Sequence, residues 1–449
     1  MCNMCGIVSI GLRPESSYWR KMCEYITGSN KNSFQENGCS ASSNCDFYVK
    51  DVADKKCFVA FDGEINNYDR LRKNLQMRGA VFATESCAEL ILHSYFAFGK
   101  TAFKNLHGSF AIAIWDGYKQ ELILVRDKIG FKPLFYYFDG TRLVFSSRIC
   151  GVLKFPFVKK DFCDDIYCKL FTLAGSKLAF DTLFDKIYEV PPSAIVTYRS
   201  GRIKTENYFM FDMESTTDSF SQTLKGLDFL LADRHFDLVM TEKPMLQNEL
   251  ENKIKEYVLI SHLPSPYIDL NDLSNLGSTQ RYVSSINLFT IPKRFKLPIK
   301  NCEGADREFV NDFLSTLPPF SYTDEKDITI KEEMYIKMSV VLPQVITAKT
   351  SACENIVFPY LQEQIFEYCL KSMKYKERLL RTYFVSKKPK PLKENIKVLK
   401  KLFSKMISDK NAMLGLVQRE ELLRFTRLFP RPETMLYLLQ ADMWLNMFL

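Results

Sequence analysis

The sequence lacks long apolar runs, a second cysteine pair and clustered histidines, and each absence excludes a class of protein. The longest apolar runs, such as Phe110 to Trp115, fall far short of the roughly 20 residues that a membrane helix needs, so we expect no membrane span. The one C-x-x-C motif is Cys2-Asn3-Met4-Cys5, and the four histidines do not cluster with cysteines. Zinc needs a second pair or nearby histidines, so we expect no metal site.

We also expect neither a nucleic-acid surface nor a secretory leader. The 61 basic and 53 acidic residues leave a net charge of +8, and no stretch combines dense Lys/Arg with stacking aromatics. The first residues do not form a basic segment followed by an apolar run and a cleavage site. Together with 13 scattered cysteines, an odd number, this predicts a protein of the reducing cytoplasm with no nucleic-acid partner.

What is present is the composition of a globular protein with two or three domains. The chain has 449 residues, of which 46% are hydrophobic and 25% charged. Its first 150 residues contain short β-prone runs that end at Gly or Asp turns. These runs are residues 6–10, 57–61, 109–115 and 121–125, with helical patterns at 68–78 and 86–98 between them. The pattern predicts an α+β domain of stacked antiparallel sheets with helices.

The rest of the chain has mostly helical periodicity and predicts a second domain that is helix-rich α/β. A strand at 194–198 and the turn Ser200-Gly201-Arg202 close the first region, so we place the boundary near residues 200–215. The helical segments are 222–232, 248–260, 332–341, 361–372, 392–408 and 435–448, with strand candidates at 236–240 and 297–300.

Cys5 opens the first strand in the run Met4-Cys5-Gly6-Ile7-Val8. If Met4 were the start and were removed, the α-amine of Cys5, with an ordinary pKa near 7.7–8.0, could serve as general base toward its own thiol. In isolation, the run favours a small buried cysteine on a strand over a nucleophile.

Further motifs follow Cys5 in order. They are Phe61-Asp62-Gly63-Glu64, Thr84-Glu85-Ser86-Cys87-Ala88-Glu89, Leu106-His107-Gly108-Ser109-Phe110 and Arg126-Asp127-Lys128-Ile129-Gly130-Phe131-Lys132-Pro133-Leu134. Together they resemble the glutaminase domain of glutamine-dependent asparagine synthetases, the class II amidotransferases. The run 301–306, Asn-Cys-Glu-Gly-Ala-Asp, resembles that family's S-G-E-G-A-D, so the resemblance extends into the second domain.

The resemblance implies an N-terminal-nucleophile fold for residues 5–208 and an ATP-pyrophosphatase-like domain for residues 209–449. In the family, the N-terminal cysteine releases ammonia from glutamine, and the second domain uses ATP and Mg to activate aspartate for attack by that ammonia. Glutamine and aspartate are then the expected small-molecule partners, and a homodimer is expected by the same resemblance. Cys5 and Glu303 occupy the family's catalytic positions.

The glutamine-site positions Asp62, Gly63, Glu64 and Cys87 depart from the family pattern. The family has an asparagine where this chain has Asp62, and that amide donates to the oxyanion together with a glycine N–H. Cys87 stands where the family has an aspartate that binds the substrate amine. No arginine lies between Arg20 and Arg70 to bind the substrate carboxylate, and Lys50 lacks the bidentate fork. We therefore expect impaired glutamine binding and hydrolysis.

The second site departs further, because no S-G-G-x-D-S phosphate loop follows a strand. The linker runs almost directly into Phe211, so the domain is expected to be truncated. Residues 215–219 imitate the loop without glycine and fit a turn or helix N-cap better. The ATP-site-like positions are Phe211, Asn301, Cys302 and Asp306. ATP and Mg would be cofactors only of an active ligase domain.

Three hypotheses follow from the sequence. The first is an asparagine-synthetase-like protein with impaired or lost catalysis. The second is an active asparagine synthetase or other glutamine-dependent amide ligase. The third is a glutaminase-type amidohydrolase that uses only the first domain, and it requires a mature chain that begins at Cys5.

Overall fold

A computed structural model describes ten ranges of the chain and the single residues 248 and 252. The ranges are 4–9, 32–36, 38–52, 54–161, 182–212, 216–232, 363–375, 378–379, 393–408 and 432–448. The chain divides into two compact units. It passes from the first unit to the second for the last time between Met210 and Phe211.

The first unit contains two six-stranded sheets, and every pairing in them is antiparallel. The first sheet has the order β10-β8-β9-β1-β3-β2, and the second has the order β12-β11-β7-β6-β5-β4. The first comprises β1 (Met4–Ser9), β2 (Asn32–Glu36), β3 (Cys39–Ser43), β8 (Phe135–Phe138), β9 (Arg142–Ser146) and β10 (Ile187–Glu189). The second comprises β4 (Asp46–Val52), β5 (Lys55–Ile65), β6 (Gly108–Asp116), β7 (Glu121–Arg126), β11 (Ala194–Arg199) and β12 (Arg202–Asn207).

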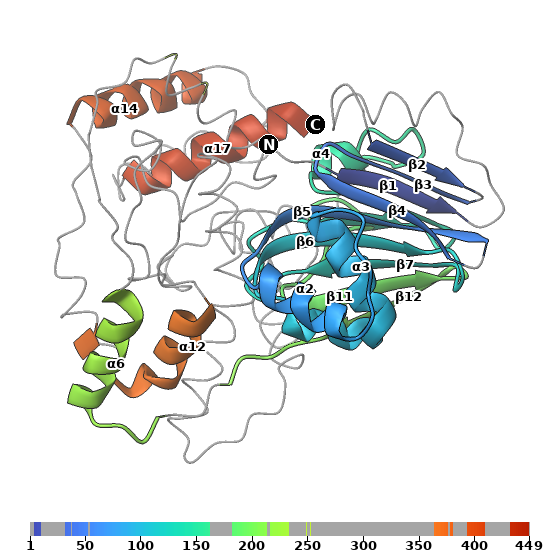
Figure 1. The fold of residues 1–449 in the computed structure, drawn as a ribbon. Coiled ribbons are helices and arrows are strands. Elements are labelled where there is room, and N and C mark those ends of the chain that lie inside the picture. The colour runs from blue at the N-terminus through green and yellow to red at the C-terminus, as the bar shows by residue number, and fades with distance from the viewer. Residues whose placement is uncertain are drawn as a thin grey trace. The chain divides into compact units, whose positions relative to one another are not determined.

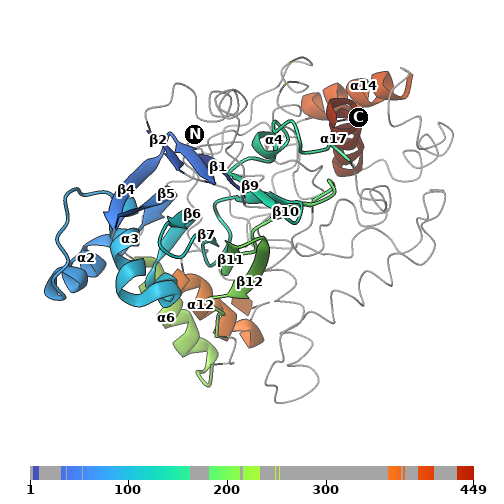
Figure 2. The ribbon, with the colours of Figure 1, turned by 90° about the vertical axis from the view of Figure 1, so that its right-hand side faces the viewer.

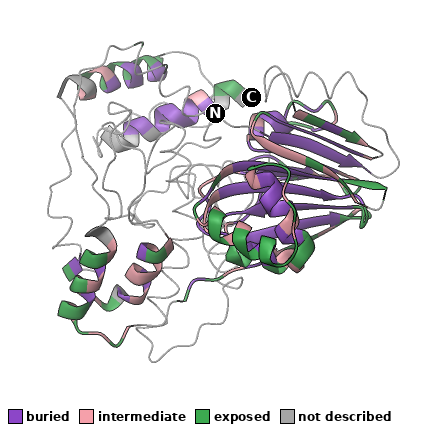
Figure 3. Ribbon diagram, in the orientation of Figure 1, coloured by how far each residue is buried: buried purple, intermediate pink, exposed green. Residues whose placement is uncertain are grey.

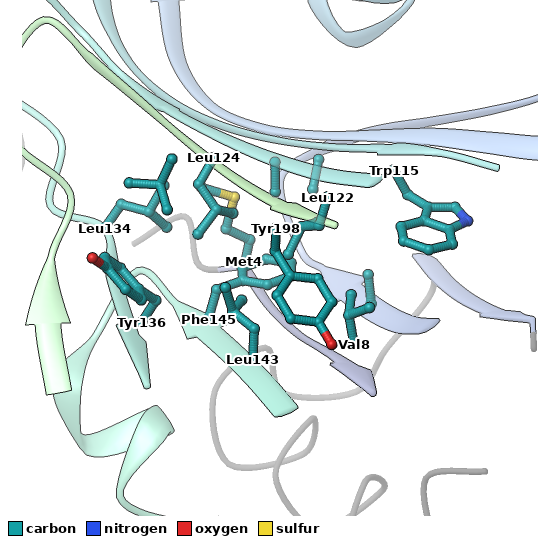
Figure 4. Packing of buried hydrophobic residues seen from close by; sticks show 14 of the residues in the cluster. Met4, Val8, Trp115, Leu122, Leu124, Leu134, Tyr136, Leu143, Phe145 and Tyr198 are labelled. Atoms are coloured by element: carbon teal, nitrogen blue, oxygen red, sulfur yellow. The ribbon is translucent and has the colours of Figure 1, made fainter. Parts of the chain in front are cut away.

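The two sheets stack face to face around an apolar core (Figure 1). Met4 and Phe145 from the first sheet pack in one buried cluster with Leu122 and Leu124 from the second (Figure 4). The central strands are buried along most of their length (Figure 3). Alternate side chains on these strands supply this core, and the side chains between them point to the opposite face of each sheet. The expected α+β class with stacked antiparallel sheets is confirmed.

Helices cover the face of the second sheet that points away from the first (Figure 2). They are α2 (Tyr68–Met77), α3 (Cys87–Phe98) and the 3₁₀ segment η1 (Gly99–Asn105), while the short α4 (Ile149–Val152) contacts β8 and β9. Ser86 caps α3 because its Oγ accepts the Glu89 N–H at 3.0 Å. Gly99, at φ 60°, ends the helix. Both helices predicted here from the sequence are confirmed to within one residue.

A buried polar cluster joins α3 to the β6–β7 hairpin. The Tyr95 hydroxyl lies 2.9 Å from Asp116 Oδ2 and 3.0 Å from Glu121 Oε1, and it accepts from Lys119 Nζ at 2.7 Å. Asp116 and Glu121 are buried, so the single hydroxyl and the ammonium offset the cost of keeping two carboxylates out of water.

We expect Tyr95→Phe to lower the free energy of unfolding of the first unit by about 1–3 kcal/mol, because it removes the buried hydroxyl that lies between the Asp116 and Glu121 carboxylates and donates to one of them. Urea-dependent hydrogen exchange of the β6 and β7 amides measures this unit by itself. Tyr118→Phe is the control, since Tyr118 is exposed. Equal losses in the two variants would contradict the role of the cluster.

The described part of the second unit is helical. It consists of α6 (Phe220–Ala232), α12 (Glu363–Lys371), η4 (Met373–Tyr375), α14 (Lys393–Ser408) and α17 (Pro432–Phe448). Helix α6 packs on α12, and α14 packs on α17. These four α-helices confirm the periodic segments predicted there. The segment 248–260 lies almost entirely outside the described residues, and the helix at 332–341, both predicted strands and the truncated ATP-pyrophosphatase architecture lie outside them.

Ser219 is the N-cap of α6. Its backbone N–H and its hydroxyl both donate to Gln222 Oε1, at 2.9 and 2.8 Å, which forms a capping box of the S-x-x-Q type. The N-cap interpretation of residues 215–219 is confirmed. Within the described ranges, every helix is too short or too polar to cross a bilayer.

Candidate functional site

Cys5 lies on β1, in the middle of the first sheet. It is directly opposite Ser42 on β3 and Ser146 on β9, and all three residues are fully buried. Met4 and Val8 point into the core between the sheets, so by strand alternation Cys5 points to the other face of its sheet. The thiol therefore belongs to a row that has a serine on each neighbouring strand.

Met4 is part of the folded core. Its N–H donates to Ser147 Oγ at 3.1 Å, and its carbonyl accepts the Ser147 N–H at 3.0 Å. Its side chain is fully buried in the core that also contains Leu134 and Phe145 (Figure 4). With Met4 in place, the nitrogen of Cys5 is a peptide amide, which has no basic lone pair. A free amine at Cys5 would require removal of a core side chain and both backbone contacts to Ser147.

Asp62 lies on β5 and faces the layer between the sheets, on the same side as Phe58 and Ala60. Its side chain is 6% exposed, and Lys132 Nζ lies 3.0 Å from its Oδ1. Burial raises the pKa of Asp62, while the positive charges of Lys132 and Arg148 act in the opposite direction. A carboxylate in this ion pair accepts hydrogen bonds and has no N–H to donate.

Gly63 follows Asp62 at a point where β5 and β6 approach closely. Its φ is 142°, and a Cβ built there would lie 2.0 Å from the Ser109 carbonyl oxygen. Only glycine fits this position without moving the backbone. Glu64 is the next residue and is exposed.

Cys87 is the first residue of α3 and lies near the end of β5. Burial, followed by the negative charges of Asp46 and Glu64, raises the pKa of the Cys87 thiol to about 11, although a backbone hydrogen bond from Ile65 opposes this. The thiol is therefore neutral at pH 7 and forms no salt bridge. A carboxylate is nevertheless present at this helix end, because Asp46 Oδ2 accepts the Ala88 N–H at 3.0 Å.

Glu64 lies close enough to Cys87 for its charge to act on the thiol. Cys5 points to the outer face of the first sheet, whereas Asp62 points into the layer between the two sheets. Lys50 lies on the helix-covered face of the second sheet, opposite Cys57, and its Nζ is 3.3 Å from His93 Nε2. Lys50 and Asp62 therefore lie on opposite faces of the second sheet.

Sequence reasoning missed three residues of this region, namely Lys132, Ser147 and Asp46. Lys132 could have been identified from the sequence, because it belongs to the motif of residues 126–134. Ser147 and Asp46 carry no pattern of their own, since their roles depend on strand pairings that bring together residues 143 and 42 positions apart.

Of the ATP-site-like positions, Phe211 lies within the described residues. It is buried and packs edge-on against Phe366, with ring centroids 5.1 Å apart at 74°. Asn301, Cys302, Glu303 and Asp306 lie outside the described residues. Among the residues that the structure describes, no three His, Cys, Asp or Glu side chains gather as metal ligands would.

Comparison with known proteins gives a consistent match for the first unit. Residues 49–209 match the family model described as "Glutamine amidotransferase domain". "Asparagine synthetase [glutamine-hydrolyzing] 3" of Bacillus subtilis (strain 168) is 30% identical over 187 residues, which are 42% of this chain and 30% of that protein. "Putative asparagine synthetase [glutamine-hydrolyzing]" of Mycobacterium tuberculosis (strain ATCC 25618 / H37Rv) is 44% identical over 94 residues, 20% of this chain and 14% of that protein. The chain thus spans less than a third of the length of either relative.

A solved structure of glutamine phosphoribosylpyrophosphate amidotransferase from B. subtilis, complexed with ADP and GMP, is also similar. The match is 16% identical, covers 57% of this chain and 58% of that chain, and has a TM-score of 0.34. A likeness of this size supports no further inference.

Proposed function

We propose that the chain is, through its first unit, a member of the asparagine-synthetase family of glutamine amidotransferases that does not hydrolyse glutamine. The observation that carries this proposal is the buried ion pair between Asp62 and Lys132, with 3.0 Å between Oδ1 and Nζ. The resemblance places an oxyanion donor at residue 62, and a carboxylate there offers negative charge to a developing negative charge. Losing one such donor costs about 10²–10³ in rate.

Two further features support the proposal. In a chain that retains Met4, the nitrogen of Cys5 is acylated and Met4 is held by Ser147, so the thiol then has no terminal amine to serve as its base. The neutral thiol of Cys87 cannot form the salt bridge that an aspartate would make with a substrate amine.

The ligase step is proposed to be absent as well. Ser219 and Gln222 cap α6 through the Ser219 hydroxyl and Gln222 Oε1, and Thr216 Oγ1 accepts the Asp218 N–H in the turn before it. This segment does not fit a pyrophosphate cradle, so we derive no step that involves ATP or Mg. The chain is then proposed to act as a folded relative in the cytoplasm, with binding of glutamine or aspartate and self-association as its remaining candidate roles.

The third hypothesis, a glutaminase confined to the first domain, remains the second candidate. It is favoured by the intact stacked sheets and by the place of Cys5 on a central strand of the first sheet. It differs from the proposal in one required feature, a free amine on Cys5.

Ammonia release from glutamine tests the proposal directly. The full chain is assayed with and without ATP, Mg and aspartate, and Cys5→Ala defines the background. We expect the wild-type rate to equal that of Cys5→Ala under all conditions. A wild-type rate above that background without ATP would support the glutaminase, and asparagine formation would support the active ligase.

A further inference from the structure

The segment 82–86, which joins α2 to α3, is held by one buried carboxylate. Glu89 accepts the Ala83 N–H at 2.8 Å through Oε1, and it accepts the Thr84 N–H at 2.7 Å through Oε2. The Thr84 hydroxyl also donates to Oε2 at 2.6 Å. Burial alone would raise the pKa of Glu89, but these hydrogen bonds and one from Tyr48 outweigh it and lower the pKa. The segment is therefore ordered by an ionised Glu89.

Aromatic packing holds the same segment on its other side. The Phe82 ring lies 4.8 Å from the His93 ring, and the Arg72 guanidinium lies 4.5 Å from the Phe82 centroid. Arg72 Nη1 also donates to the Thr84 carbonyl at 2.8 Å. His93 thus contacts the segment through Phe82 and lies one helical turn after Glu89.

The contact between His93 and Lys50 fixes the protonation state of the imidazole. Lys50 Nζ lies 3.3 Å from His93 Nε2, and an ammonium can only donate. Nε2 must therefore accept, which requires a neutral imidazole with its proton on Nδ1. The same Nε2 lies 3.8 Å from Glu89 Oε1.

We propose that Lys50, His93 and Glu89 form a pH-sensitive clamp that orders the segment 82–86 while His93 is neutral and releases it when His93 is protonated. A second proton on the ring places two cations 3.3 Å apart, so Lys50 and His93 repel. The imidazolium instead attracts Glu89, whose Oε1 is the acceptor of the Ala83 N–H. Competition for that oxygen weakens the attachment of the segment.

The charged and titratable groups around His93 favour its neutral form. Lys50 and Tyr48 face it from β4, Glu89 faces it from α3, and Arg72 of α2 reaches it through the Phe82 ring. Burial and then Lys50 lower the pKa of His93, and Glu89 opposes them only in part. The folded state therefore binds this proton less tightly than an unfolded histidine, whose pKa is about 6.5. Acidification below that value favours the released segment over the ordered one.

Hydrogen exchange of the Ala83 and Thr84 amides in the full chain tests the clamp. After correction for intrinsic exchange, we expect protection of both amides to fall by up to about tenfold per pH unit as the pH drops from about 6.5, the pKa of a released histidine, toward the lower pKa of His93 in the ordered segment, and to level off below that pKa. His93→Gln accepts from Lys50 without titrating, so its protection should not change with pH. His107→Gln is the matched control and should keep the wild-type pH dependence.

A second variant keeps the test decisive if His93→Gln fails to fold. Lys50→Met removes the neighbouring cation, so the pKa of His93, measured by NMR, should rise. The clamp is overturned if wild-type protection does not change with pH, if His93→Gln shows the wild-type fall, or if Lys50→Met leaves the pKa of His93 unchanged. None of these results depends on whether the chain hydrolyses glutamine.

Discussion

Asp62→Asn, introduced into a chain that begins at Cys5, is expected to raise glutamine hydrolysis by about 10²–10³ over the same chain with Asp62, because the resemblance assigns residue 62 as the oxyanion donor once Cys5 is N-terminal, whereas the two side chains lie on different faces in the chain that retains Met4. The substitution keeps the size of the side chain and removes the negative charge. Lys132 loses its partner at little cost, since its side chain is 34% exposed and can be hydrated. Ammonia release from glutamine is the measurement.

Asp62→Leu is the matched control for this experiment. It also removes the charge but offers no N–H, so it should gain clearly less than Asp62→Asn. If Asp62→Leu gains as much as Asp62→Asn, then charge repulsion alone was the block. If neither variant gains although both fold, then residue 62 is not what prevents hydrolysis.

Arg126→Met is expected to destabilise the first unit by about 3–5 kcal/mol, because it leaves a buried carboxylate without its partner. Arg126 is 1% exposed, and its Nη1 lies 2.7 Å from Glu189 Oε1. The guanidinium also donates to the carbonyls of Val190 and Gly130, at 2.9 and 2.8 Å. One side chain thus joins β7 to β10 and to the loop that leads to Lys132.

Urea-dependent hydrogen exchange of the β7 and β11 amides measures this loss. Lys204→Met is the control, because Lys204 is exposed and such surface pairs contribute about 0–1 kcal/mol. A loss for Arg126→Met no larger than that of Lys204→Met would contradict the structural role of the buried pair.

The parts of the fold that were predicted from the sequence are those with strong local patterns. Strands β5, β6 and β7 are apolar runs with turn residues beyond them, and α3 has a serine N-cap and a glycine stop. Strand β3 was missed because its sequence, Cys-Ser-Ala-Ser-Ser, has little strand propensity. It is nevertheless buried throughout, because β1 and β2 pair with it on both sides. Tertiary pairing decides its structure.

The candidate site likewise depends on tertiary packing that the sequence alone does not show. The motifs identified Asp62 as a departure from the family, but the partner that neutralises it comes from Lys132, beyond β6 and β7. A sequence also cannot show on which face of its sheet Cys5 lies, because that depends on Met4 packing between the sheets. Pairwise geometry of this kind follows from the packed strands and not from local spacing.

The most direct test of the central claim is the reaction of the full natural chain with a glutamine-mimicking electrophile, such as a diazoketone analogue, followed by intact-mass analysis and peptide mapping. The same mass determines whether the chain begins before or at Cys5. The account predicts a chain that retains Met4 and acquires no adduct at Cys5. An adduct on Cys5 in the natural chain would contradict it, because the cysteine would then be a working nucleophile despite Met4 and the Asp62–Lys132 pair.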